Sequence, residues 1–406
     1  MLGFENYNYF TLKNNRVAKT PIKVVEFLNT LSKIVEPIAK EEMKILEEEK
    51  NKWEGSSTIY PWDKPYYAGI AKAKKYNLTS TQLKEYFTLG NCMEGIRIIC
   101  NRLFDIDLHF VPMNNYETWH PDVYKIHVVH KDNGLIGILY LDVFSRQNKF
   151  SHAATFTLQL PKVDESGQLL SVPKVALVCN FNDESEGIPT LSYSELETLF
   201  HEFGHCMSAL MSRTQLQHVA GTRAALDFIE TPSTLMEYFA TDKRILSLFA
   251  KSYKTGEVIP SQLLLNLTSS QSMFAAIDIQ QQISYAMFDQ IIHSKYPLEN
   301  SISSIYFDLQ SKYTNVIPTS NDYWYSRFGH LIGYGSGYYS YLYSKTFSGT
   351  IWQKCFVNDP LDKFHASRYA EKILYYGGSK DPLLMLNDLL GSEPSPLEFI
   401  KSIKNI

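Results

Sequence analysis

The sequence predicts a mainly α-helical protein that carries one small antiparallel β-sheet. Apolar residues recur at helical spacing near the N-terminus, and again from residue 192 to the end of the chain. Between residues 124 and 180 the pattern changes to short β-rich runs separated by turn residues. The composition, 44% hydrophobic and 14% aromatic, is typical of a well-packed globular protein.

The first predicted element is a long amphipathic helix over residues 21–49, with charge gathered toward its C-terminal end. The sheet is predicted to be antiparallel, with three or four strands. Its strands fall in 124–130, 135–144, 154–160 and 174–180. Helical periodicity then returns in 192–211, 233–253, 261–296, 300–313 and 336–357. No repeat, low-complexity segment or linker marks a domain boundary.

Charge and hydropathy exclude several classes of protein. The 39 Lys and Arg nearly balance the 43 Asp and Glu, so no basic field supports nucleic-acid binding. No apolar run approaches the roughly 18–20 residues that span a bilayer, and no membrane insertion is expected. Five cysteines without CxxC spacing predict reduced, mostly buried thiols in an intracellular compartment. The first residues lack a secretory signal and fit a mitochondrial presequence poorly, since Glu5 is present and no arginine precedes Arg16.

The clearest chemical motif lies in the apolar helix predicted over 192–211, for which Ser194 and Glu197 offer a capping box. Its sequence HEFGH, residues 201–205, has two histidines four positions apart, so both imidazoles can bind one Zn²⁺. Glu202 would then lie beside the open position of the metal, as a general base for the bound water. The alternative is an exposed helical turn with two solvated histidines, but polar groups left unpaired in an apolar helix are costly.

A catalytic zinc commonly takes three protein ligands and keeps a fourth position for water. The metzincin arrangement would need Gly and His where this chain has Ser208 and Met211. The next acidic residues are Asp227, Glu230 and Glu237, which share one face if a helix runs through them. Spacing alone does not choose among the three. Each of them could equally belong to an acidic first turn that complements the helix dipole.

A glycine-rich segment, GYGSG, is followed by YYSY in residues 333–341. The glycines offer a flexible hinge, and the tyrosines offer phenolic donors suited to oxyanion stabilisation. It is not a phosphate loop, because no GK[ST] follows. The alternative, a helix start with aromatic core packing, stays open at this point because the chain has 27 tyrosines.

HEFGH followed by GTRAALDFIETPSTLMEYFA resembles the thimet oligopeptidase family of zinc metallopeptidases, most closely its mitochondrial intermediate peptidase branch. Further shared segments are AKTP (18–21), PWDKPYY (61–67), GILYLDVF (137–144) and FGHLIGYGSGYYSYLYSK (328–345). The resemblance covers essentially the whole chain, with its motifs in family order. It implies a zincin-like, mainly helical catalytic domain over residues 1–406, without the family's N-terminal helical region and cleavable presequence.

The resemblance also implies the composition of the metal site. One Zn²⁺ per chain would be held by His201, His205 and Glu230, the last being the glutamate of the family's DF-x-E-x-PS motif. Asp227 and Glu237 are expected to accept hydrogen bonds from the other ring nitrogens of the two histidines.

By the same resemblance, the glycine-rich loop and its tyrosines close over the substrate. His330, Tyr338 and Tyr341 are expected to act on the tetrahedral intermediate, together with the base Glu202. Three further residues are expected to bind substrate: Gly333, Tyr334 and Gly335.

The function implied is a monomeric zinc endopeptidase of the mitochondrial matrix that removes a short N-terminal oligopeptide from imported, unfolded precursor proteins. Two alternatives stay open. One is a soluble, cytoplasmic oligopeptidase that degrades short free peptides, and the other is an inactive peptide-binding fragment that lacks the N-terminal wall of the family's channel.

Overall fold

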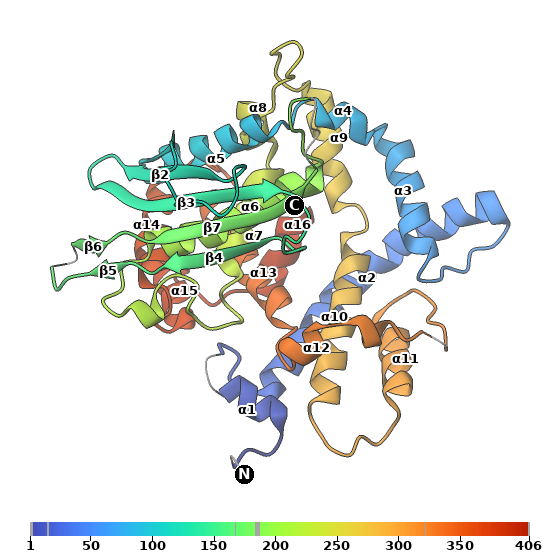
Figure 1. The fold of residues 1–406 in the computed structure, drawn as a ribbon. Coiled ribbons are helices and arrows are strands. Elements are labelled where there is room, and N and C mark those ends of the chain that lie inside the picture. The colour runs from blue at the N-terminus through green and yellow to red at the C-terminus, as the bar shows by residue number, and fades with distance from the viewer. Residues whose placement is uncertain (1–2, 14–15, 167, 183–186, 321, 405–406) are drawn as a thin grey trace.

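The computed structural model describes residues 3–13, 16–166, 168–182, 187–320 and 322–404. Helices make up most of these residues, and a small sheet lies at one side of the molecule (Figure 1). The prediction of a mainly α-helical fold with one small sheet is therefore confirmed. No helix in these ranges combines the length and the apolar character that crossing a bilayer requires.

The helices run in chain order from the N-terminal α1 to the C-terminal α16. They are α1 (Tyr7–Lys13), α2 (Pro21–Glu54), α3 (Asp63–Tyr76), α4 (Ser80–Lys84), α5 (Leu89–Phe104), α6 (Tyr193–Met211), α7 (Thr231–Thr241), α8 (Lys243–Phe249), α9 (Ser261–Ser272), α10 (Ala275–Ile292), α11 (Ile302–Tyr313), α12 (His330–Gly333), α13 (Ser340–Ile351), α14 (Lys363–Lys372), α15 (Pro382–Leu390) and α16 (Pro396–Lys404). The strands are β1 (Ile106–Val111), β2 (Tyr124–His130), β3 (Gly134–Phe144), β4 (Ala154–Gln159), β5 (Lys162–Val163), β6 (Leu169–Ser171) and β7 (Lys174–Phe181).

The long helix α2 begins as predicted and ends five residues later than predicted. The Thr20 hydroxyl accepts from the Lys23 N–H at 3.3 Å, and Pro21 occupies the first turn, where its missing N–H costs nothing. The helix passes Pro37 and stops at Gly55, which has a left-handed backbone (φ 67°). Its buried apolar stripe packs against α10.

The main sheet has the strand order β1-β2-β3-β7-β4. All four predicted strands are present, but β1 was missed. The antiparallel prediction needs one correction, because β3 and β7 pair in parallel. The chain leaves β3, forms β4 and the β5–β6 hairpin, and returns as β7 between β3 and β4, a crossover long enough for a parallel pair. As a result, β4 is the edge strand that lies against α6, the helix that carries HEFGH (Figure 1).

The boundaries of several helices differ from the predicted segments. Asp242 ends α7 and caps α8 by accepting from the Arg244 N–H at 2.8 Å, so 233–253 forms two helices. Phe274, with a left-handed backbone (φ 70°), divides 261–296 into α9 and α10. Helix α13 starts after Ser336 because that residue also has a left-handed backbone (φ 63°).

The capping box predicted at Ser194 and Glu197 is also wrong, because α6 begins earlier. Ser192 accepts from the Glu195 N–H at 3.3 Å, and Glu195 accepts from the Ser192 N–H at 2.7 Å. Both pairs have the same spacing, so the sequence pattern could not separate them.

Two large clusters of buried apolar side chains fill most of the interior of the described residues, and a third, small cluster lies on β3 and β7. The sheet cluster joins β1, β2, β3 and β7 to α5, α6, α7, α8 and α14. The helical cluster joins α2, α3, α10, α11 and α16. The five cysteines are free and buried, which confirms the expectation of buried thiols.

A buried lysine joins the ends of β3 and β7. The Lys149 side chain is 3% exposed, and its Nζ donates to the carbonyls of Asp142 (2.9 Å), Phe144 (2.6 Å) and Cys179 (2.6 Å). The same ammonium lies 2.9 Å from the Asp142 carboxylate, which Arg146 also binds, at 2.6 Å. Lys149 therefore provides hydrogen-bond donors for the carbonyls at the C-terminal ends of β3 and β7, the parallel pair.

We expect Lys149→Met to lower the free energy of unfolding by about 3 kcal/mol, because it removes one partner of a buried ion pair and orphans three carbonyls. Urea denaturation monitored by circular dichroism measures the loss. Lys44→Met removes an exposed lysine on α2 and should leave the denaturation midpoint unchanged. Equal midpoints for the two variants would contradict the role assigned to Lys149.

Candidate metal centre

Helix α6 supplies two imidazoles to one point. His201 and His205 lie one turn apart, with ring centroids 5.1 Å apart and planes at 80°. The rest of the helix is largely buried in the sheet cluster, including Phe200 just before the motif and Phe203 within it. Because its apolar face is held by the core, α6 has little freedom to rotate, and the direction of both imidazoles is set by packing.

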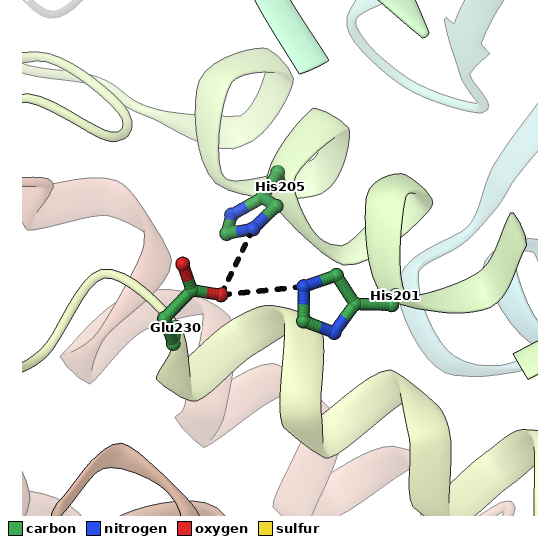
Figure 2. Close-up of side chains that lie close together, drawn as sticks. All are labelled: His201, His205 and Glu230. Atoms are coloured by element: carbon green, nitrogen blue, oxygen red, sulfur yellow. Dashed lines mark ion pairs between the residues drawn. The ribbon is translucent and has the colours of Figure 1, made fainter. Parts of the chain in front are cut away.

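Glu230 approaches the histidines from the start of α7. Its Oε2 lies 3.3 Å from His201 Nε2 and 3.1 Å from His205 Nε2 (Figure 2). The Ser233 hydroxyl, 3.0 Å from the same Oε2 and 2.9 Å from the Glu230 carbonyl, ties the side chain to the first turn of α7. The carboxylate is thus held in one position by α7 and faces both imidazoles of α6.

These three side chains fit a tetrahedral metal ion. Their ligand atoms all lie within 4.8 Å of one another. Bonds of about 2.0–2.1 Å in tetrahedral geometry place zinc ligands roughly 3.3 Å apart. The two distances from Glu230 Oε2, 3.3 and 3.1 Å, agree with that spacing. Two imidazole nitrogens and one carboxylate oxygen also form a common donor set for Zn²⁺, with a fourth position left for water.

The electrostatics of the centre favour positive charge between these groups. Burial alone would raise the pKa of Glu230, but hydrogen bonds to His201 and His205 hold it well below its usual value. Burial would lower the pKa of His201, but the carboxylates of Glu230 and Glu237 raise it to about 10. These carboxylates therefore favour a cation at this point, either a proton on the imidazole or a metal ion in its place.

Glu237 lies on the outer side of His201. Its Oε1 is 2.6 Å from His201 Nδ1, and its Oε2 is 3.9 Å from Lys345 Nζ. A carboxylate in this position accepts a hydrogen bond from Nδ1–H, which leaves the Nε2 lone pair directed at the candidate metal position. The contact expected for Glu237 is present.

Asp227 does not make the expected contact with an imidazole. Its carboxylate is fully buried and accepts from the N–H groups of Val17 (2.7 Å) and Ala18 (3.0 Å) and from the Tyr339 hydroxyl (2.7 Å). Its backbone carbonyl accepts from Ser344 at 3.0 Å. The structure thus corrects this expectation: Asp227 joins the N-terminal segment and α13 to the segment that precedes Glu230.

Glu202 is buried between α6 and the edge strand. It is 7% exposed, and its Oε2 accepts from the Thr155 hydroxyl at 2.9 Å. The same hydroxyl lies 2.9 Å from the Glu202 carbonyl, so β4 contacts both ends of this residue. The contact between Thr155 and Glu202 was not predicted, because nothing in the sequence of β4 shows that this strand lies beside α6.

Aromatic rings around α12 bring the other expected residues together. The Tyr341 hydroxyl lies 3.3 Å from His330 Nε2, and the His330 ring packs 5.3 Å from that of Tyr338. The Tyr334 hydroxyl donates to the Leu226 carbonyl at 3.3 Å, so the loop contacts the segment leading to Glu230. Burial, with the charge of Glu230, raises the pKa of Tyr341 to about 12.

The two glycines expected to bind substrate differ in their surroundings. Gly333 is exposed, and a side chain there would meet nothing within 4 Å. Gly335 is buried, and a Cβ there would lie 2.8 Å from His293 Nε2. Glycine fits at position 335 because the His293 ring occupies the space that a side chain would need.

A further glycine, which the sequence reasoning passed over, sets the distance between α6 and α7. A Cβ on Gly204 would lie 2.5 Å from the Ser233 Cα and 2.6 Å from the Pro232 carbonyl oxygen. Only a residue without a side chain allows this approach. The sequence feature that indicates this close approach is a glycine in the middle of a strongly apolar helix.

The sequence is similar to those of known peptidases along nearly its whole length. The sequence profile of peptidase family M3 matches residues 1–405. The mitochondrial intermediate peptidase of Arabidopsis thaliana is 40% identical over 97% of this chain and 56% of its own length. The mitochondrial intermediate peptidase of Homo sapiens is 38% identical over 99% of this chain and 56% of its own length.

Solved structures show the same fold at low sequence identity. PZ peptidase A with an inhibitor matches all of this chain and 61% of its own, with a TM-score of 0.57 and 16% identity. A Pyrococcus furiosus carboxypeptidase matches all of this chain and 70% of its own, with a TM-score of 0.58 and 15% identity.

The helical fold and the HEFGH helix with a downstream glutamate define a candidate metallopeptidase centre. The chain belongs to peptidase family M3. It spans about half the length of the curated relatives it matches.

We expect Gly204→Ala to weaken Zn²⁺ binding by roughly tenfold or more, because the added methyl pushes α7 and its glutamate away from the histidines. Competition with a fluorescent chelator measures the dissociation constant. Gly69→Ala is the matched control, since a side chain there meets nothing within 4 Å in helix α3. Unchanged zinc affinity in a folded Gly204→Ala protein would refute the spacing argument.

Glu237→Gln should weaken Zn²⁺ binding by roughly 10–100-fold, because a neutral amide orients the His201 imidazole but no longer increases its basicity. The same competition assay checks the loss, with the exposed Glu48→Gln on α2 as control. An affinity equal to that of the control would show that this carboxylate does not act on the metal site.

Proposed function

We propose that this chain is a zinc-dependent endopeptidase in which residues 1–406 act as one catalytic domain with one Zn²⁺. The observation that carries the proposal is the tetrahedral spacing of His201, His205 and Glu230, with the buried carboxylate of Glu202 on the same helix. A donor set that leaves one position open is the arrangement of catalytic rather than structural zinc.

Glu202 is the proposed general base. Bound at the three ligand atoms, Zn²⁺ would act as a Lewis acid toward a water and toward the substrate carbonyl. Glu202 takes the proton of the attacking water and then delivers it to the leaving amine. The Thr155 hydroxyl, which donates to Glu202 Oε2, fixes one carboxylate oxygen and leaves the other for the proton transfer.

Tyr338, Tyr341 and His330 are the proposed donors to the tetrahedral oxyanion. The Tyr338 hydroxyl donates to Gln282 Oε1 at 2.7 Å in this structure and would exchange that partner for the oxyanion. Burial raises the pKa of Tyr341 to about 12, so its phenol stays protonated at neutral pH and can donate. The Tyr341 hydroxyl and His330 Nε2 are 3.3 Å apart, close enough to share one acceptor. Tyr334 is the proposed substrate contact on the same loop, together with the exposed backbone at Gly333, whereas buried Gly335 supports the loop.

Strand β4 is the proposed platform for the substrate backbone. It is the edge of the sheet, so one side of its backbone pairs with no other strand of the described residues, and it touches Glu202 through Thr155. An extended peptide can add to such an edge by main-chain hydrogen bonds, which would suit unfolded chains and short peptides.

The proposed biological substrates are unfolded mitochondrial precursor proteins, from which a short N-terminal oligopeptide is removed in the matrix, by a monomeric enzyme. The support is the likeness to mitochondrial intermediate peptidases along nearly the whole of this chain. Cleavage of free peptides alone would favour the alternative, a soluble oligopeptidase.

Glu202→Gln should abolish hydrolysis of an internally quenched peptide, with kcat reduced roughly 10³-fold or more, while zinc is retained. Chelation of the metal should have the same effect on the parent chain, and added Zn²⁺ should restore activity. The control Glu48→Gln should keep parental rates. A folded, zinc-loaded parent chain that cleaves nothing would contradict the proposal and favour a peptide-binding fragment.

A further inference from the structure

Asp289 on α10 is a buried carboxylate directed at the loop that carries the tyrosines. It is fully buried, its Oδ1 accepts from the Ser336 N–H at 2.8 Å, and its Oδ2 accepts from the Tyr338 N–H at 3.0 Å. The two oxygens therefore hold the backbone on both sides of Gly337. Charge-assisted bonds of this kind are stronger than bonds between neutral groups.

The loop backbone needs such support. Ser336 has a left-handed backbone (φ 63°), which residues with a Cβ adopt rarely and which persists only where the surroundings fix it. Gln290, next to Asp289, donates from Nε2 to the Ser336 carbonyl at 3.0 Å. Helix α10 thus binds both the N–H and the C=O of the strained residue.

His293, the residue that directly follows α10, completes the anchor. Its Nδ1 lies 2.9 Å from the Asp289 Oδ1, and its ring packs against Gly335 at a distance that leaves no room for a Cβ. Burial opposes the charged imidazole, but Asp289 and the backbone of Leu331 raise its pKa. His293 therefore joins Asp289 to the part of the loop that precedes Ser336.

The anchored segment carries Tyr338, one of the proposed oxyanion donors, and lies between the other two, His330 and Tyr341. Tyr338 is held at its own N–H by Asp289, and its ring packs against His330 at 5.3 Å. On the other side, Tyr334 contacts the Leu226 carbonyl, four residues before Glu230. The loop thus bridges α10 and the segment that carries the third metal ligand.

We propose that Asp289, with His293, is a positioning pair that fixes residues 333–338 so that Tyr338 and His330 reach the substrate carbonyl. This inference rests on the proposed peptidase function. The pair touches neither the metal position nor the substrate, and acts through the loop backbone. Loss of Asp289 should therefore reduce catalysis more than substrate or zinc binding.

The test compares Asp289→Asn with the parent in the full zinc-loaded chain. Asparagine has an NH2 group in place of one carboxylate oxygen, and this group cannot accept a hydrogen bond, so either the Ser336 or the Tyr338 N–H loses its acceptor. We expect amide hydrogen exchange in 333–338 to become at least about tenfold faster, and kcat on a quenched peptide to fall by about tenfold or more. KM should rise by less than kcat falls, since Tyr334 and Gly333 in this segment are proposed substrate contacts, and zinc affinity should stay within about twofold. Hydrogen exchange by mass spectrometry and steady-state kinetics give these values.

Asp63→Asn is the matched control. Asp63 is also buried, and accepts from the Tyr60 N–H at 2.9 Å and from Lys50 at 2.5 Å, but it lies in α3, away from the loop. It should alter neither exchange in 333–338 nor kcat. Gly335→Ala serves as a second variant if Asp289→Asn does not fold, since its methyl would displace the loop from His293 without removing a buried charge.

Unchanged exchange in 333–338, or an equal loss of kcat in the Asp63→Asn control, would overturn the inference. A loss confined to KM would also overturn it, because it would place the loop in ground-state binding. Absence of hydrolysis by the parent chain would instead contradict the proposed function, while the exchange comparison would still support or overturn the anchoring of the loop by Asp289.

Discussion

The close contact between α6 and α7 is the constraint on which the site depends. Gly204 allows the backbone of Pro232 and Ser233 to approach α6 with no side chain between them. Glu230, at the start of α7, can then face both histidines of α6 at 3.1 and 3.3 Å. Because the ligands come from two helices, a shift of a few tenths of an ångström between those helices changes the ligand spacing directly.

Three carboxylates, two of them fully buried, connect the remaining parts of the centre to this helix pair. Glu237 binds the outer nitrogen of His201, Asp227 ties the N-terminal segment and α13 to the approach to Glu230, and Asp289 holds the loop. Each of these carboxylates is satisfied by N–H or O–H donors, so burial does not leave an unpaired charge. Asp227 and Asp289 thus link segments that are far apart in the sequence.

Features that depend on local periodicity were predictable from the sequence, and those that depend on distant contacts were not. The HEFGH helix and the strands at 124–130 and 174–180 follow from spacing and β-rich composition. The position of β7 between β3 and β4 could not be predicted, because it depends on the path of the connection from β3 to β7, which the pattern of the strand does not show. Spacing alone did not distinguish Glu230 from Asp227 and Glu237, because the approach of Glu230 to α6 depends on tertiary packing. Tertiary packing also sets the hydrogen-bond partners of Asp227, which are Val17 and Tyr339.

The two sides of the proposed reaction centre belong to different interior clusters. The proposed metal ligands lie on α6 and directly before α7, two helices of the sheet cluster, whereas Tyr338 packs with the helical cluster. Polar contacts cross between them, from Tyr339 to Asp227 at 2.7 Å and from Tyr334 to Leu226 at 3.3 Å. The distance between the oxyanion donors and the metal position is therefore set by how the two clusters pack. A substitution at this boundary would alter catalysis without touching a ligand or a donor, because it would move one side of the site relative to the other.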